Sequence, residues 1–251
     1  MSLPIITDPF FYAVAIPSTL LMGVSKSGFG TGFGSLAVPL MALAVSVPDA
    51  AAILMPVLLL TDILGLIFLR AHLDWKLLKF LVPCGLMGTV LGYFLFRLLD
   101  PAVVAGMVGA FTLLFLAQRL LFKPRPDAPP PPRWLGALLT MTSGFTSFIA
   151  HAGGPPISAY VIPLRLSPLL FTSTMAYFFF VINLSKWVPY GLLGLLDMRN
   201  MLTSVVLLPL VPLGVWAGIT MARKIEPDLF YKFVYAGMFL TGLKLLWDAL
   251  R

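Results

Sequence analysis

Charged residues are scarce in this chain, and their scarcity excludes a soluble protein. Only 11% of the 251 residues are Asp, Glu, Lys or Arg, whereas 59% are hydrophobic and the mean hydropathy is +0.98. A soluble domain carries roughly 25% charged residues, so there is too little polar surface here to cover a globule of this size. Several runs of about 20 residues carry almost no charge, as a helix that crosses a bilayer requires.

Cysteine and histidine are nearly absent as well. The single cysteine, Cys84, excludes an internal disulfide and a cysteine metal cluster. There are two histidines, His72 and His151, and no H-E-x-x-H, G-x-S-x-G or P-loop motif. Because these motifs are absent, we expect no enzyme, no metal and no cofactor. An intramembrane enzyme would have to use His151 with Asp62 or Ser147. The N-terminus lacks a basic region, and we therefore expect no cleaved signal peptide.

The hydrophobic runs predict helices rather than strands. In lipid every backbone polar group must be satisfied internally, which allows only helical bundles and closed barrels. Strand-like alternation is absent, so we expect an all-α integral membrane protein. The formal net charge is +7, but the Lys and Arg residues lie mostly between hydrophobic runs, where they set the orientation of helices. We therefore expect a lipid bilayer, and no nucleic acid, as the partner.

A proline-rich segment divides the chain into two similar halves. Residues 123–133 read KPRPDAPPPPR, which predicts a stiff linker between an N-terminal repeat (1–122) and a C-terminal repeat (134–251). In each half, a glycine-broken pair of short apolar segments precedes three longer transmembrane helices. The expected segments are 10–23, 34–46, 50–69, 77–96 and 102–122 in the first half, and 134–150, 154–164, 169–195, 200–221 and 229–247 in the second.

Matching details support the duplication. The turn LDWK at 73–76 corresponds to LDMR at 196–199. Both fourth segments carry a small-xxx-small pair of the kind that lets membrane helices pack closely. These pairs are Gly88 with Gly92 and Gly214 with Gly218.

The positive charges favour two inverted repeats with both termini outside and a cytoplasmic linker. Basic residues are retained on the cytoplasmic side of a membrane, and inversion places most of them together. On that side would lie Arg70, Lys76, Lys79, Lys123, Arg125, Arg133, Arg165, Arg223, Lys224 and Lys232; outside would lie Arg97, Arg199 and Arg251. Inversion requires each glycine-broken pair to return to its starting side, so we interpret 134–164 as a hairpin of half-helices.

Both breaks have the composition of an anion site. Irregular backbone at membrane depth is tolerated where it lines a cavity, and the N-termini of broken helices meet anionic substrates there. Glycines let backbone N–H groups converge on one point, while hydroxyls and a lysine add donors. The candidate substrate-binding residues are Lys26, Ser27, Gly28, Gly30, Thr31, Gly32, Gly34, Ser147, His151, Gly153 and Gly154, with Ser35 and Ser143 as further hydroxyls and Pro155 and Pro156 opening the second half-helix.

Each of these features also has a purely structural interpretation. The glycines could serve close helix packing alone. Lys26 and Asp62 form either a structural ion pair or a centre in which Asp62 binds a proton or cation, and Asp62 aligns with Asn183 of the second half. His151 is either a proton acceptor or a neutral hydrogen-bonded ring. Lys186 either takes part in coupling or extends to the interface beside the WVPY segment. Asp62, His151, Asn183 and Lys186 are thus the candidate coupling or gating residues.

The two glycine-rich motifs resemble those of the TauE/SafE sulfite exporter family. They read GFGTGFGSLAVPL at 28–40 and HAGGPPISAYVIPL at 151–164. The resemblance covers almost the whole chain and implies a secondary transporter that exports sulfite or an organosulfonate across the bacterial plasma (inner) membrane without ATP hydrolysis. The motif positions are Gly28, Gly30, Gly32, Gly34, Pro39, Gly153, Gly154 and Pro163, whereas Thr31, Phe33, Pro155 and Pro156 depart from the usual pattern.

The function expected is a secondary carrier for a small sulfur-containing anion, coupled to protons, with its site between the two breaks. An anion channel is the alternative of the same broad class, and the intramembrane enzyme that uses His151 is the alternative of another class. A structural scaffold would have no need of a buried lysine and aspartate. The sequence leaves open the coupling ion and whether the protein is a homodimer.

Overall fold

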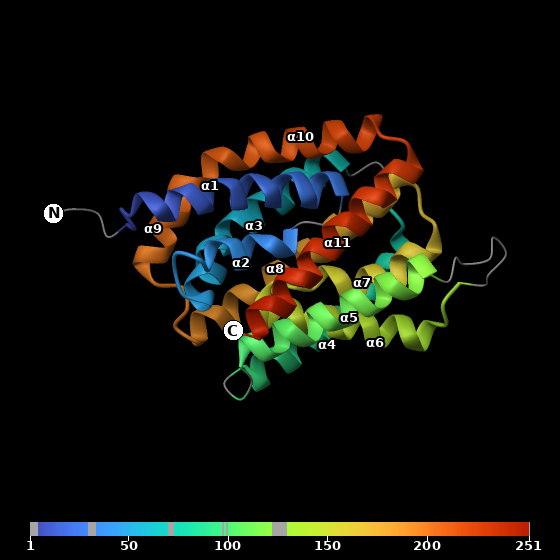
Figure 1. The fold of residues 1–251 in the computed structure, drawn as a ribbon, viewed down its shortest axis with the longest axis horizontal. Helices are drawn as coiled ribbons and strands as arrows, with labels where there is room; N and C mark the ends of the chain where they lie inside the picture. The colour runs from blue at the N-terminus through green and yellow to red at the C-terminus, as the bar shows by residue number, and fades with distance from the viewer. Residues whose placement is uncertain are drawn as a thin grey trace.

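The computed structural model describes residues 5–29, 34–69, 73–96, 98, 100–121 and 130–250, and these residues form helices joined by short turns, without a strand among them (Figure 1). The all-helical prediction is confirmed. Most of the proline-rich linker, residues 123–129, lies outside the described part of the chain.

The first half contains a broken helix pair and three long helices. Proline residues and side-chain caps set several helix starts: the Asp8 carboxylate accepts from the N–H of Phe10, and the Asp74 carboxylate accepts from the N–H of Leu77. The elements are α1 Pro9–Val24, a π-helical turn Ser25–Phe29, a 3-10 turn Gly34–Leu36, α2 Ala37–Met41, α3 Val47–Leu69, α4 Trp75–Leu95 and α5 Pro101–Leu121.

The second half repeats this order, with the fourth span interrupted by proline. Ser167 caps α8 and Asp197 caps α9, so the corresponding turns LDWK and LDMR both supply an aspartate N-cap. The elements are α6 Arg133–Ala150, α7 Gly154–Val161, a 3-10 turn Ile162–Leu164, α8 Pro168–Leu192, α9 Met198–Leu207, a 3-10 turn Leu208–Leu210, α10 Val211–Lys224 and α11 Pro227–Ala249.

Four stretches among the described residues are long and apolar enough to cross a membrane: Pro48–Phe68, Trp75–Leu95, Pro168–Leu192 and Met198–Met221.

The broken pair of the second half has unequal arms. Helix α6 has 18 residues, about 27 Å at 1.5 Å per residue, which nearly matches the roughly 30 Å of hydrocarbon. Helix α7 has 8 residues. The two arms of the expected hairpin thus differ in length.

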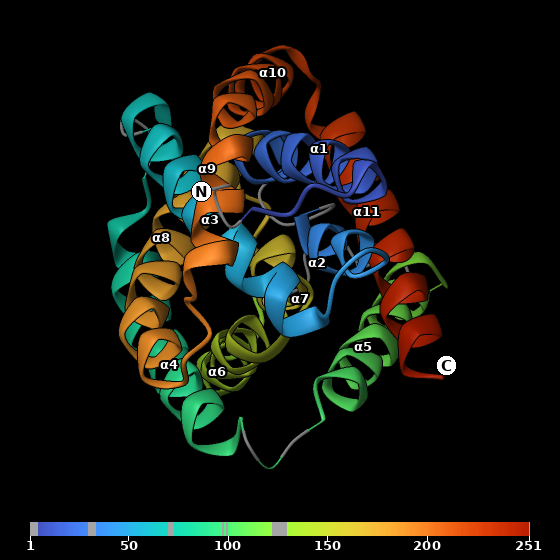
Figure 2. The same cartoon turned by 90° about the vertical axis from the view of Figure 1, so that its left-hand side faces the viewer.

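The two halves are packed into each other rather than side by side. Helix α1 contacts α10 of the second half, and α6 contacts α4 of the first half. Helix α3 contacts α8, and α5 contacts α11. Viewed along the bundle, the short helices α2 and α7 lie inside a ring of longer ones (Figure 2).

Glycines form the closest of these contacts. A Cβ on Gly92 would lie 2.8 Å from Cβ of Phe148 in α6, and a Cβ on Gly214 would lie 3.1 Å from Cα of Gly23 in α1. A Cβ on Gly88 would overlap the carbonyl group of Met141 in α6. The small-xxx-small pairs are therefore helix contacts, as the sequence predicted.

We expect Gly88→Ala to destabilise the protein, because α4 and α6 would have to separate to admit the methyl group. The cost of such overpacking is about 1–3 kcal/mol. Gly191→Ala is the matched control, since a Cβ there meets nothing within 4 Å. Thermal unfolding of the detergent-solubilised variants measures the difference, and equal melting temperatures for the two would contradict the assignment of Gly88 to a tight contact.

Candidate functional site

Three polar side chains from separate segments meet inside the bundle. Lys26 lies in the π-helical turn that follows α1, Asp62 lies on α3 and Asn183 on α8. The Lys26 Nζ forms an ion pair with the Asp62 carboxylate, and the Asn183 Nδ2 donates to Asp62 Oδ2 at 2.7 Å. All three are buried, and Asp62 is 1% exposed. The structure thus brings together Lys26, Asp62 and Asn183, which lie far apart in the sequence.

The ion pair compensates the charge of Lys26. Two unit charges removed from water are tolerated when they are paired and hydrogen-bonded, and Asp62 has both lysine and amide partners. The ring centroid of Phe179 lies 5.7 Å from Lys26 Nζ, within reach of a cation–π contact. The sequence left open whether Lys26 and Asp62 pair with each other. In this structure they form an ion pair.

Lys186 is enclosed in a second polar cluster at the other break. Its side chain is fully buried, and Nζ donates to the carbonyl oxygen of Ser147 at 3.1 Å and to Ser147 Oγ at 3.2 Å. His151 Nδ1 lies 3.0 Å from the same Nζ. The interpretation that Lys186 extends to the interface is therefore wrong, because its ammonium group is bonded inside the bundle. Among the described residues Lys186 forms no ion pair with a carboxylate.

His151 ends α6 in a left-handed conformation with φ 50°. The N–H of Ala152 closes this cap by donating to the carbonyl of Thr146. The ring has Nε2 3.2 Å from the carbonyl oxygen of Ala51 on α3 and Nδ1 facing Lys186. Nδ1 also lies 3.1 Å from the carbonyl oxygen of Ser147. A neutral ring that donates from Nε2 to Ala51 can accept from the Lys186 ammonium group at Nδ1. The ring nitrogens thus face carbonyls and an ammonium group rather than a nucleophilic hydroxyl.

One face of α8 connects the two clusters. Phe179, Asn183, Lys186 and Tyr190 follow one another at intervals of four, three and four residues, which places them along one side of a helix. The Phe179 ring also borders the second break, since a Cβ on Gly153 would lie 3.1 Å from Phe179 Cε1. We call these four residues the α8 stripe.

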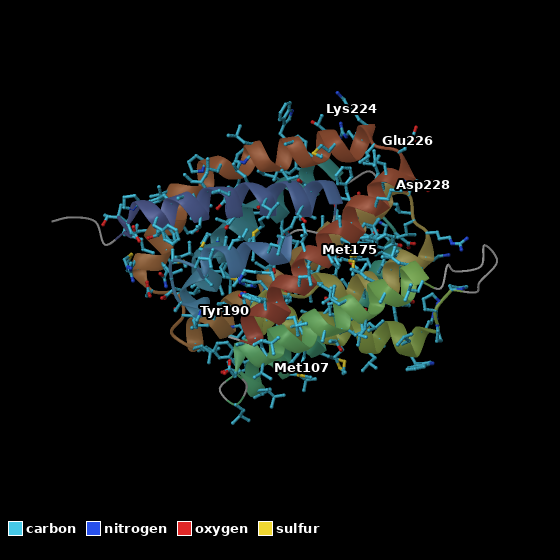
Figure 3. The ribbon with its side chains drawn as sticks, in the orientation of Figure 1. Met107, Met175, Tyr190, Lys224, Glu226 and Asp228 are labelled. Carbon is cyan, nitrogen blue, oxygen red and sulfur yellow. The ribbon has the colours of Figure 1, made fainter. Side chains whose placement is uncertain are left out.

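Tyr190, which is labelled in Figure 3, is the last residue of the α8 stripe. Its hydroxyl donates to the carbonyl of Phe148 at 2.7 Å, and its ring stacks on His151 with centroids 6.1 Å apart. Tyr190 is 1% exposed, so this end of the WVPY segment is core rather than an interfacial aromatic belt.

Two serine hydroxyls at the breaks donate hydrogen bonds to backbone carbonyls. Ser27 Oγ donates to the carbonyl of Gly23 at 2.5 Å, with the carbonyl of Val215 at 3.1 Å. Ser143 Oγ donates to the carbonyl of Gly153 at 2.6 Å. These two serines stabilise the breaks, whereas Ser147 Oγ faces the Lys186 ammonium group.

Packing explains some of the glycines. A Cβ on Gly28 would lie 2.6 Å from the carbonyl oxygen of Gly218, so α10 approaches this turn too closely for a side chain. The N–H of Gly34 donates to Ser25 Oγ at 2.8 Å. Three further candidates lie outside the described residues: Gly30, Thr31 and Gly32.

The second break begins a helix inside the bundle. Helix α7 starts at Gly154 and has no side-chain cap, and all eight of its residues are buried. Pro155 and Pro156 carry no N–H, so Gly154 is the backbone donor among its first three residues. The positive end of a helix dipole thus lies beside Gly153 and the α8 stripe.

A family model matches residues 15–245: sulfite exporter TauE/SafE. The chain belongs to this family. The family is one of transporters, and its sulfite exporters move sulfur-containing anions across membranes. Together with the long apolar helices, membership makes the protein a multi-pass membrane transporter. No curated protein and no solved structure matches the chain significantly.

Two residues of the candidate site in this TauE/SafE protein, Phe179 and Tyr190, were not predicted from the sequence. Phe179 and Tyr190 were not distinguished from other aromatic residues of a hydrophobic span. The signal was their helical spacing from Asn183 and Lys186, because side chains three or four residues apart share a face. The carbonyl of Ala51, which accepts from His151, has no sequence signature at all.

We expect Lys26→Met to destabilise the protein by about 3–5 kcal/mol, because it leaves the Asp62 carboxylate buried without its cation. Adding Asp62→Asn removes the orphaned charge and keeps an oxygen that can accept from Asn183, so the double variant should recover most of the loss. Lys244→Met is the control, since Lys244 pairs with Asp248 at a partly exposed position on α11.

Thermal unfolding in detergent distinguishes these cases. If the double variant were as unstable as Lys26→Met, the unpaired Asp62 carboxylate would not be the cause of the lost stability. The Lys244→Met variant should lose about 1 kcal/mol or less.

Proposed function

We propose that the protein is a secondary transporter that exports a small sulfur-containing anion, such as sulfite or an organosulfonate, across the bacterial plasma membrane. The observation that carries this proposal is an uncompensated charge. Among the described residues, Lys26, Asp62 and Lys186 are the formally charged side chains that are buried. Asp62 balances Lys26, and Lys186 has only neutral partners. A buried cation requires a partner, and an anionic substrate would supply it.

The proposed site lies between the two breaks, along the α8 stripe. Lys186, Ser147 and His151 would bind the anion at one end, with Gly153 and the N-terminus of α7 adding backbone donors and positive potential. Lys26, Ser27, Gly28 and Gly34 would border the site at the other break, together with Gly30, Thr31 and Gly32. Asp62 and Asn183 would couple transport to a second ion, for which a proton is the candidate.

Two inverted repeats are supported by the way the halves pack. Helix α1 contacts α10 as α6 contacts α4, while α3 pairs with α8 and α5 with α11. This exchange is what a two-fold axis relating the repeats produces. Movement of one group of helices against the other would then open the site alternately to each side of the membrane.

The ends of the bundle differ in charge, which supports an orientation with both termini outside. Lys224 marks the end where α10 leads into α11, at the right in Figure 3. Helices α4, α6 and α8 begin toward the same end in Figure 1. Basic residues at or near the turns of this end are Lys76, Lys79, Arg133, Arg165, Arg223, Lys224 and Lys232. This end would face the cytoplasm, because positive residues are retained there.

Sulfite uptake into proteoliposomes tests the function. We expect saturable uptake by the wild type and a loss of about 10- to 100-fold in Lys186→Met, because a hydrogen bond to a charged group contributes about 1.5–3 kcal/mol. Methionine replaces the buried ammonium group with an apolar chain of similar length, so folding should be preserved. Lys244→Met removes a cation from α11 and should transport as the wild type does.

Absence of wild-type uptake in sealed vesicles under every imposed proton gradient would overturn the transporter proposal. Sulfite current without any coupled ion movement would instead identify an anion channel. Normal uptake by Lys186→Met would refute the site while leaving the function in place.

A further inference from the structure

The arrangement of buried charges bears on which anions the site accepts. Counted formally, two lysines and one carboxylate leave one net positive charge among the buried side chains of the described residues. Lys26 faces the Asp62 carboxylate from the π-helical turn, and Asn183 faces it from α8. Lys186 lies about one helical turn beyond Asn183, and the His151 ring contacts its ammonium group.

We propose that Asp62 sets the charge of the transported anion. With its carboxylate ionised, the site compensates one negative charge and accepts a monovalent anion. A divalent anion is accepted only together with a proton on Asp62, which releases Lys26 to bind the second negative charge. This inference rests on the proposed function, because it concerns the anion that Lys186 would bind.

The contacts of Asp62 suit such an exchange. When the carboxylate is ionised it pairs with the Lys26 ammonium group and accepts a hydrogen bond from Asn183. When it is protonated it becomes a donor as well, and an amide side chain can accept through its oxygen as readily as it donates through its nitrogen. Asn183 therefore remains a partner of Asp62 in either state, and only Lys26 loses its counter-ion. That lysine is then the group that an anion would neutralise.

The wild-type protein should discriminate two probes whose own charge is constant between about pH 6 and about pH 8. Methanesulfonate is monovalent, and sulfate is divalent. We expect the affinity for methanesulfonate, measured by thermal stabilisation in detergent, to be equal at both pH values within about twofold. Sulfate should bind up to about 100-fold more tightly at the lower pH, because uptake of one proton per anion corresponds to at most tenfold per pH unit.

Substitutions change the charge in both directions. Asp62→Asn leaves two uncompensated lysines and should bind sulfate independently of pH. Lys186→Gln leaves no net charge, so the affinity for methanesulfonate should now fall as pH rises. The double variant Lys186→Gln with Asp62→Asn restores one net positive charge and should bind methanesulfonate without pH dependence. Asp248→Asn, which alters the lysine-paired carboxylate of α11, is the matched control and should behave as the wild type.

Folding of each variant is verified by its melting temperature without anion, and Asp62→Asn retains an acceptor for both of its partners. The inference alone is overturned if the wild type takes up sulfite but sulfate binding is independent of pH, or if Asp62→Asn leaves the pH dependence unchanged. The proposed function fails if none of the three anions (sulfite, methanesulfonate and sulfate) raises the melting temperature of the wild type or is transported by it. This inference then fails as well.

Discussion

The cost of keeping charge away from water governs the interior of this protein. A lysine or aspartate at membrane depth is stable only when other groups replace its hydration. The pairing of Lys26 with Asp62 joins the first glycine break to α3, and the hydrogen bond from Asn183 adds α8. Lys186 joins α8 to the second break through Ser147 and His151. These polar contacts thus join segments of both halves of the chain.

Backbone irregularity in this fold serves those polar contacts. The π-helical turn Ser25–Phe29 places Lys26 toward α3, and the left-handed His151 turns its ring toward Ala51. Both irregular segments need neighbours without side chains, which Gly218 and Gly153 supply. Glycine placement and charge placement are therefore two aspects of one requirement of this fold.

The sequence predicted the helices well and the site only in part. Runs such as 50–69 and 77–96 agree with α3 and α4 because hydrophobic length alone decides whether a segment crosses lipid. Lys26, Asp62, His151 and Lys186 were recognisable because charge and titratable groups are rare in such runs. Their pairing was not, since the neighbouring positions Lys186 and Trp187 differ in burial only once α8 is docked.

The interlocked packing of the halves has a consequence for biosynthesis. Helix α1 leaves the ribosome long before its partner α10, which begins only at Val211. Until then the contact surface of α1 around Gly23 has no final partner. Helix α1 must therefore wait within the insertion machinery or in lipid until α10 has been made. Membrane insertion and assembly are thus separate events for this protein.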